Sequence, residues 1–145
     1  MSFLQGLKIS ATALSAERVR MNVISSNLAN ANTTRTEEGG PYKRKDVVFS
    51  SRDSGFAFDK LMRLAFDPNV KEVRVDGIIE DQRAPRMVHN PSHPDANAEG
   101  YVAMPNISVM EEMVNMITSN RSFESNTQAI QATKSMATTA ITIGK

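Results

Sequence analysis

The chain has 145 residues, the size of one ordinary domain, and its net charge of +1 gives no electrostatic reason to expect nucleic acid or an anionic membrane as a partner. The absence of cysteine excludes disulfides, thiolate metal sites and cysteine nucleophiles. No apolar run approaches ~18 residues, and the first residues lack the basic start and apolar core of a secretory signal. We therefore expect no membrane insertion, and a protein that is either cytosolic or exported without a cleaved signal peptide.

Charge and helix-breaking residues divide the sequence into two ends and a middle. The ends, residues 1–34 and 105–145, hold 4 and 6 charged residues, whereas the middle, residues 35–104, holds 23. All six prolines lie at positions 41–105, so the ends favour long helices and the middle favours short strands and loops. This predicts an α+β fold in which two terminal helices pair like a coiled coil beside a small β-rich region.

The first predicted helix spans residues 2–28. Its apolar seam recurs every seven residues, at Leu7, Leu14, Met21 and Leu28. A period of seven keeps one seam turned toward a partner helix. The helix is expected to end in the Asn-rich run 26–33, because Asn and Ser side chains offer the backbone hydrogen bonds that compete with a helix.

A linker, residues 33–41, follows this helix. Gly39 and Gly40 permit backbone angles that are closed to other residues, and Pro41 fixes the entry into a strand at Tyr42. We predict that this linker follows one ordered path; a floppy tether is the alternative.

Four short strands are predicted for the middle, at residues 42–49, 70–81, 86–89 and 101–104, and residues 58–66 fit either a helical turn or a strand. In the second strand one face collects Val73, Val75, Gly77 and Ile79. The pair Asp76-Gly77 would ordinarily predict a hairpin, but a fold there would put Glu80 opposite Val73. We therefore predict a continuous strand, with residues 86–89 as its return strand.

The last predicted helix spans residues 107–143, with Asn106 or Ser108 as its N-cap. Its heptad series is Val109, Met116, Phe123, Ile130 and Ala137. A second apolar stripe holds Met113, Ile117, Ala129, Ala132, Met136, Ala140 and Ile143. At about 55 Å this helix is too long for a compact domain of this size, so it is expected to project from the body.

Small polar residues cover the remaining positions of the last helix. Residues 105–145 contain 15 Ser, Thr or Asn residues and only 6 charges, whereas a solvated helix face is normally rich in Glu and Lys. This composition suits close packing against protein on several sides; a weakly helical tail is the alternative.

Catalytic, cofactor and metal sites find no support in the sequence. His89, His93 and Asp95 could form a three-ligand set, but the prolines around them favour a surface turn. The basic triplet 43–45 is flanked by acidic residues, which favours a solvated strand or a partner contact over phosphate binding. We expect no enzyme, no cofactor and no small-molecule substrate.

The string Ser-Ser-Asn-Leu-Ala-Asn-Ala-Asn-Thr-Thr occupies residues 25–34. It resembles a string of bacterial flagellar rod and hook proteins. Its continuation through residue 45, and the segments 93–96, 99–106, 111–114, 120–124 and 132–137, are similar to members that build the proximal rod. The chain departs from them at Glu37, where Pro is commoner, and at Phe123, where Tyr is commoner.

This resemblance implies a structural subunit of the flagellar proximal rod, a tubular drive shaft in the basal body that transmits torque and surrounds the export channel. It implies an inner layer of paired terminal helices and outer β-rich parts. The implied partners are other copies of the chain, a second proximal-rod protein, the export-gate adaptor at the rod base and the distal-rod proteins. Export by the flagellar type III apparatus into the periplasmic space is implied as well.

A helical-hairpin adaptor with a β insertion is the alternative function. The two functions differ in assembly, because an adaptor would form a discrete oligomer.

Overall fold

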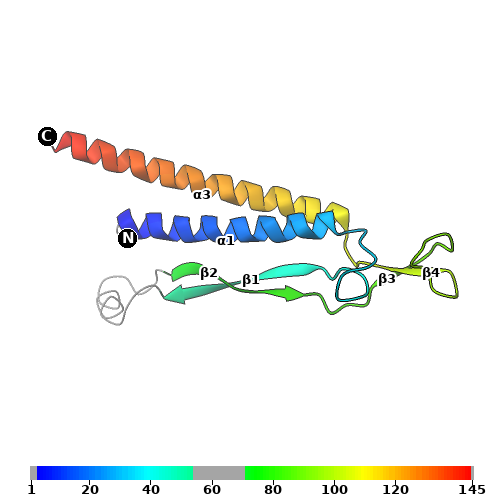
Figure 1. The fold of residues 1–145 in the computed structure, drawn as a ribbon. Coiled ribbons are helices and arrows are strands. Elements are labelled where there is room, and N and C mark those ends of the chain that lie inside the picture. The colour runs from blue at the N-terminus through cyan, green and yellow to red at the C-terminus, as the bar shows by residue number, and fades with distance from the viewer. Residues whose placement is uncertain (1–2, 54–70, 145) are drawn as a thin grey trace.

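The computed structural model describes residues 3–53 and 71–144, and it shows two long helices beside two small β-hairpins (Figure 1). Helix α1 spans Phe3–Ala29 and helix α3 spans Val109–Ile143. The helices run in opposite directions, and α3 continues past the beginning of α1 and diverges from it (Figure 1). The prediction of an α+β fold with paired terminal helices is therefore confirmed.

Local chemistry favours the beginning of α3 and the end of α1. Ser108 is the N-cap of α3, and its hydroxyl accepts a hydrogen bond from the Glu111 backbone N–H. Glu111 and Glu112 then occupy the first turn, where carboxylates suit the helix dipole. Helix α1 ends in the Asn-rich run, where the Asn30 side chain donates to the Ser26 carbonyl at 2.9 Å.

The first hairpin pairs β1, Lys45–Asp53, with β2, Lys71–Glu80. Strand β2 is continuous through Asp76-Gly77, as predicted. The predicted return strand is wrong: residues 86–89 form β3, Arg86–His89, which pairs with β4, Tyr101–Met104. The nine residues of β1 offer β2 a longer partner than the four of β3, and the Asp81 N–H bonds the Arg44 carbonyl at 2.8 Å, which extends the β1 pairing.

A bulge interrupts the first hairpin. Phe49 lies opposite Val75 and Val48 lies opposite Gly77, so Asp76 is the extra residue. The bulge reverses the alternation of side chains along β2, and Ile79, opposite Asp46, shares a face with that residue. The predicted common face of Val73, Val75, Gly77 and Ile79 is therefore wrong beyond the bulge, and Ile79 is 56% exposed.

The second hairpin contains a glycine that its geometry requires. Gly100 has φ = +80°, and a Cβ there would lie 3.1 Å from the Pro91 ring and 3.2 Å from His89 Nε2. Gly100 ends the turn 97–100 directly before β4, where its N–H donates to the Asn97 carbonyl at 2.9 Å. The predicted alternatives for residues 58–66 lie outside the described residues.

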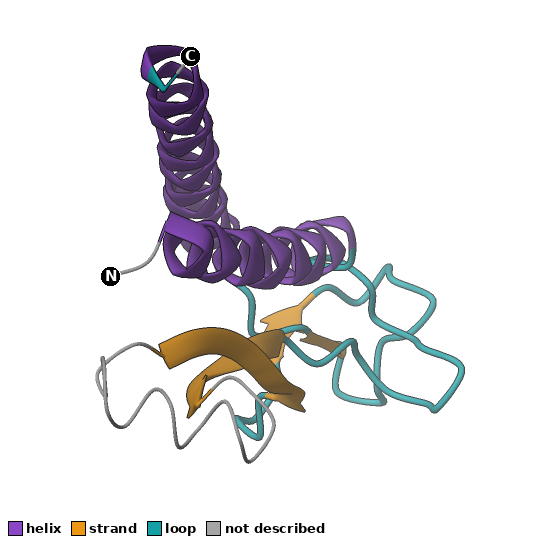
Figure 2. Ribbon diagram, turned by 90° about the vertical axis from the view of Figure 1, so that its left-hand side faces the viewer, coloured by secondary structure: helices purple, strands orange, loops and turns teal. Residues whose placement is uncertain are grey.

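Helix α1 lies in the middle of the molecule. Helix α3 packs on one side of it, and the hairpin β1–β2 packs on the other (Figures 1 and 2). The buried apolar side chains belong mainly to α1, its C-terminal flank and the approach to α3: Ala16, Val23, Ile24, Ala31, Val102 and Ile107. The core is small, so most of the α3 surface is open in the single chain.

Candidate functional site

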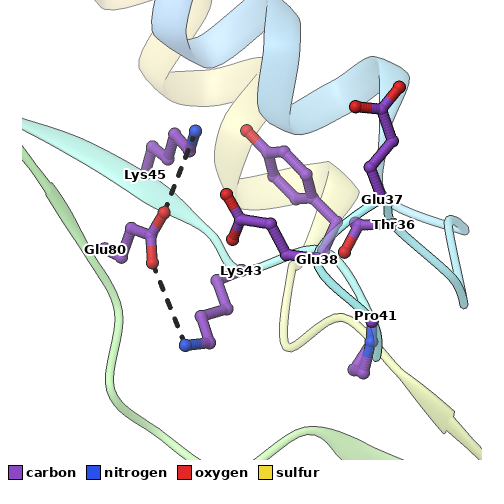
Figure 3. Close-up of a pocket in the computed structure, with 9 residues that line it drawn as sticks. Thr36, Glu37, Glu38, Pro41, Lys43, Lys45 and Glu80 are labelled. Carbon is purple, nitrogen blue, oxygen red and sulfur yellow. Dashed lines mark ion pairs between the residues drawn. The ribbon is translucent and has the colours of Figure 1, made fainter.

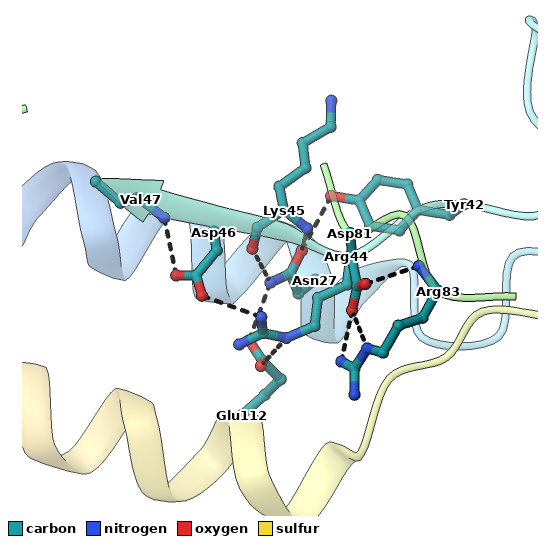
Figure 4. A network of polar contacts seen from close by, with 9 residues as sticks. All are labelled: Asn27, Tyr42, Arg44, Lys45, Asp46, Val47, Asp81, Arg83 and Glu112. Carbon is teal, nitrogen blue, oxygen red and sulfur yellow. Dashed lines mark hydrogen bonds and ion pairs between the residues drawn. The ribbon is translucent and has the colours of Figure 1, made fainter. Parts of the chain in front are cut away.

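A fully buried asparagine joins three elements of the fold (Figure 4). The carboxamide of Asn27, near the end of α1, donates to the Lys45 carbonyl at 2.8 Å and to Glu112 Oε2 at 3.0 Å. Its oxygen accepts from the Lys45 N–H at 2.9 Å and from the Tyr42 hydroxyl at 3.2 Å. Both donors and both acceptor positions of this amide are therefore used, and α1, β1 and α3 meet at it.

The acid in this junction is held by one cation. Glu112 is 1% exposed, and its Oε1 accepts from Arg44 Nε at 2.8 Å. Arg44 Nη1 also lies 3.2 Å from Asp46 Oδ2. Burial lowers the pKa of Arg44, but the hydrogen bonds and charges of Glu112 and Asp46 outweigh burial and raise that pKa overall. The buried carboxylate of Glu112 is therefore both ion-paired and hydrogen-bonded, and it is not an isolated buried charge.

A second ion pair forms in the turn directly after β2. Arg83 donates from its backbone N–H to Asp81 Oδ1 at 2.9 Å and from Nε to Asp81 Oδ2 at 2.7 Å (Figure 4). The side-chain hydrogen bond from Arg83, helped by its backbone N–H, lowers the pKa of the Asp81 carboxyl. This pair is exposed, so it shapes the turn more than it stabilises the fold.

The predicted linker forms a closed loop. The Thr36 N–H donates to the Gly40 carbonyl at 2.9 Å, and the Tyr42 N–H donates to the Thr33 carbonyl at 3.1 Å. Gly39 and Gly40 have φ values of +84° and +82°, which other residues rarely adopt. The two glycines therefore have the backbone role that the sequence assigns to them.

A groove of about 310 Å³ lies between this loop and the end of β2 (Figure 3). Glu80 stands on one wall, with Lys43 Nζ and Lys45 Nζ each 3.9 Å from its oxygens. Glu37 and Glu38 line the loop side, and both are exposed. These are open, solvated charges, which suit contact with another protein surface better than catalysis.

The predicted seam residues differ in how deeply the structure buries them. On α1, half-buried side chains are found at Leu7, Leu14, Met21 and Leu28. On α3, half-buried side chains are found at Met116, Phe123, Ile130 and Ala137, whereas Val109 is 48% exposed. The most deeply buried positions of the helices are others: Ala16, Val23, Ile24, Asn27, Glu112 and Ser119.

Sequence reasoning missed the junction itself. Glu112 reads as an ordinary acid of a first helical turn, and Asn27 reads as part of a helix-ending run. The sequence also gives no signal for the contact between Arg44 and Glu112. The two residues lie 68 positions apart, and sequence periodicity does not connect positions at that distance.

The two histidines lie in the second hairpin, His89 in β3 and His93 in the loop that follows it. His93 Nδ1 accepts the Asp95 N–H at 3.1 Å, and no group of three or more metal-ligating side chains is found in residues 3–53 and 71–144. Neither of the two described helices is long and apolar enough to cross a membrane.

Comparison with known proteins matches each end of the chain to a family of flagellar basal-body rod proteins. Residues 7–35 match the family described as flagella basal body rod protein, and residues 98–143 match the C-terminal family of flagellar basal body rod FlgEFG proteins. The chain is 43% identical to the flagellar basal-body rod protein FlgC of Bacillus subtilis, with both chains fully covered. It is 35% identical to FlgC of Borreliella burgdorferi, with 99% of this chain and 98% of that one covered, and 36% identical over full length to FlgC of Escherichia coli O157:H7.

Two long helices with a small β insertion, matched over the whole chain to relatives of one kind, establish a structural role in the flagellum. The chain belongs to the FlgC family of flagellar basal-body rod proteins.

Proposed function

We propose that this rod subunit builds the tube wall with its terminal helices inside and its β hairpins outside. In this arrangement residues 1–34 and 105–145 form the inner axial unit, and residues 35–104 form the outer region. The observation that carries the proposal is the outward face of α3, which is apolar and open in the single chain.

The exposed apolar side chains of α3 are too large and too numerous for a solvated helix. Exposed fractions are 74% for Met110, 51% for Met113, 56% for Val114 and 53% for Ile117. Further along the helix, Met136, Ile141 and Ile143 are 63–81% exposed. Burying one such side chain completely stabilises an association by about 1.5–3 kcal/mol, so the assembled state is the one in which this face is stable.

The threonines of α3 make the helix suitable for burial on any side. The hydroxyl of each described threonine in the helix donates to a carbonyl one turn earlier in the same helix, at 2.6–2.9 Å for Thr118, Thr127, Thr133, Thr138 and Thr142, and at 3.0 Å for Thr139. A hydroxyl satisfied in this way needs no water, so covering it with protein costs little. The polar composition of α3 therefore supports a helix enclosed by neighbours better than a weakly helical tail.

The expected neighbours are further copies of this chain and other flagellar rod proteins: a second proximal-rod protein, the export-gate adaptor at the rod base and the distal-rod proteins. In this function the chain binds no nucleic acid and no small-molecule substrate, does not insert into a membrane and is not an enzyme. It reaches the periplasmic rod through the flagellar type III apparatus without loss of a signal peptide.

Rod assembly tests this proposal. Met113→Asp or Ile117→Asp changes a side chain that is open in the monomer, so the purified protein should keep its thermal midpoint while rod assembly and motility fail. Ile79→Asp is the matched control, because it makes the same kind of change at a similar exposure in β2. Normal motility of the α3 variants, or a discrete soluble oligomer of the native chain, would favour the adaptor instead.

A further inference from the structure

We infer that the buried network of Asn27, Arg44 and Glu112 fixes the register of α3 along α1 and the position of β1 against both helices. We call this network the lock, because the rest of the helix seam does not define the register. The inference goes beyond the proposed function, because it concerns the geometry of the single chain. Its basis is that one buried side chain, Asn27, makes hydrogen bonds to a strand and to the other helix (Figure 4).

The remainder of the α3 seam repeats too regularly to define a register. The positions of α3 that turn toward the molecule recur every three and four residues. One set is apolar or small: Met116, Phe123, Ile130 and Ala137. The other set is polar: Glu112, Ser119, Asn126 and Thr133. A shift of one heptad, about 10 Å, replaces each residue with another of the same kind at every layer except that of Glu112.

The buried serine illustrates how little the other polar layers specify. Ser119 is 0% exposed, and its hydroxyl has no hydrogen-bond partner in the part of the chain that the structure describes. The Asn126 amide donates to the Ser122 carbonyl of its own helix at 2.9 Å, and the Thr133 hydroxyl donates to the Ala129 carbonyl at 2.6 Å. These side chains tolerate several partners, so none of them ties α3 to one position on α1.

Glu112 requires two specific partners at once. Its Oε1 accepts from Arg44 and its Oε2 accepts from Asn27, so position 112 must supply two acceptor oxygens. A glutamine has the same shape but only one acceptor oxygen, and its NH₂ group would face a donor of either Asn27 or Arg44. A shift of α3 would leave a buried carboxylate without its cation, which is strongly unfavourable.

Asn27 extends the lock to the sheet. It accepts from the N–H of Lys45 and donates to the carbonyl of the same residue, as a neighbouring strand would on the free edge of β1. The same amide donates to Glu112. One side chain therefore sets the distance between the hairpin and the helix pair, as a single buried polar residue sets the register of a coiled coil.

Disulfide scanning tests the lock, because the chain has no cysteine of its own. The full-length protein carries Ala16→Cys together with one cysteine on α3, at position 116, 119, 123, 126 or 130. Antiparallel alignment from Asn27 and Glu112 places Ala16 near positions 119 and 123, so cross-linking of the parent protein should be strongest there. Positions 126 and 130 report a shift of one heptad.

In the Glu112→Gln background the ratio of in-register to shifted cross-links should fall about tenfold, the effect expected when a buried donor loses its acceptor. Glu111→Gln is the matched control: the same change one residue away, on an exposed side chain, should leave the ratio unchanged. Equal cross-linking at all α3 positions in the parent protein, or an unchanged ratio in Glu112→Gln, would overturn the inference.

A second variant separates register from stability. Asn27→Leu, Arg44→Met and Glu112→Leu together replace the network with apolar side chains of similar volume. Replacing the buried ion pair in this way often maintains stability, whereas Asn27→Leu also removes the partner of the Lys45 backbone N–H and carbonyl, which should lower the thermal midpoint. We expect the triple variant to keep its helix content by circular dichroism while its in-register ratio falls as in Glu112→Gln. A triple variant that retains the parent ratio, whether or not its thermal midpoint changes, would show that packing alone defines the register.

Discussion

Asn27 Nδ2 donates to Glu112 Oε2 at 3.0 Å, across 85 residues of sequence, and this bond joins the last turns of α1 to the first turn of α3. Both side chains are shielded from water. The two ends of the chain therefore meet through a polar contact at the point where the β region enters the helix pair.

Asn27→Asp should destabilise the protein by about 3 kcal/mol or more. The new carboxylate cannot donate to Lys45 or Glu112, and it lies beside the Glu112 carboxylate in a buried site. Urea denaturation followed by circular dichroism measures the change. Asn32→Asp, at an exposed position just after the helix, is the control and should change the free energy of unfolding by less than about 0.5 kcal/mol.

Replacing Gly39-Gly40 with Ala-Ala should destabilise the linker by roughly 1–2 kcal/mol per residue, because both positions have positive φ. Rod assembly should be impaired in proportion. Gly6→Ala is the control: Gly6 lies in α1 with open space around a Cβ, so alanine there should be neutral or stabilising. A fully motile Ala-Ala variant with an unchanged thermal midpoint would show that the linker is a passive tether.

Ile130→Asp should weaken the packing of α3 on α1, because the new carboxylate enters a half-buried position of the helix seam, where loss of water disfavours a charged group. We expect a cost of a few kcal/mol in the assembled rod. Gln131→Asp, at the exposed neighbouring position, should have a much smaller effect. Motility at equal export levels compares the two, and equal motility would remove Ile130 from the seam.

Hydrogen exchange should divide α3 into two parts in the monomer. Residues 112–123 include the buried Glu112 and Ser119, whereas from residue 134 onward the described side chains are exposed except Ala137. An isolated helix end of this composition is marginal in water, so residues 134–143 should exchange freely in the monomer and become protected in the rod. Strong protection of these residues in a verified monomer would contradict this.

The Asp81 carboxyl should stay ionised to a lower pH than an ordinary aspartate, because Arg83 lowers its pKa. A lowered pKa in the folded state means that the contribution of this pair is present above the unfolded pKa and is lost as pH falls through the folded pKa. Arg83→Gln should therefore raise the pKa of Asp81 in an NMR titration. An unchanged titration would show that the Arg83 contact does not form in solution.

Sequence periodicity predicted the helices and strands of this fold better than it predicted which strands pair. Low charge and the lack of proline identify both terminal helices, and the cap at Ser108 follows from local chemistry. The pairing of β2 with β1 instead of β3 was not predictable from alternation, because the bulge at Asp76 reverses the pattern that alternation reads.

The junction was unpredictable for a related reason. Asn27, Arg44 and Glu112 each have an ordinary local explanation, as a helix-ending residue, a strand cation and a first-turn acid. Their common role depends on the meeting of three elements, which only the tertiary structure defines. By contrast, the need for glycine at positions 39 and 40 is a local property of the backbone, and the sequence indicates it directly.

An electron cryomicroscopy map of the flagellar rod containing this chain tests the central claim most directly. The account predicts that α1 and α3 lie in the inner wall of the tube, with Met110, Met113 and Ile117 covered by helices of neighbouring subunits and β1–β2 on the outside. A map in which this face of α3 meets solvent, or in which the β hairpins line the channel, would contradict it.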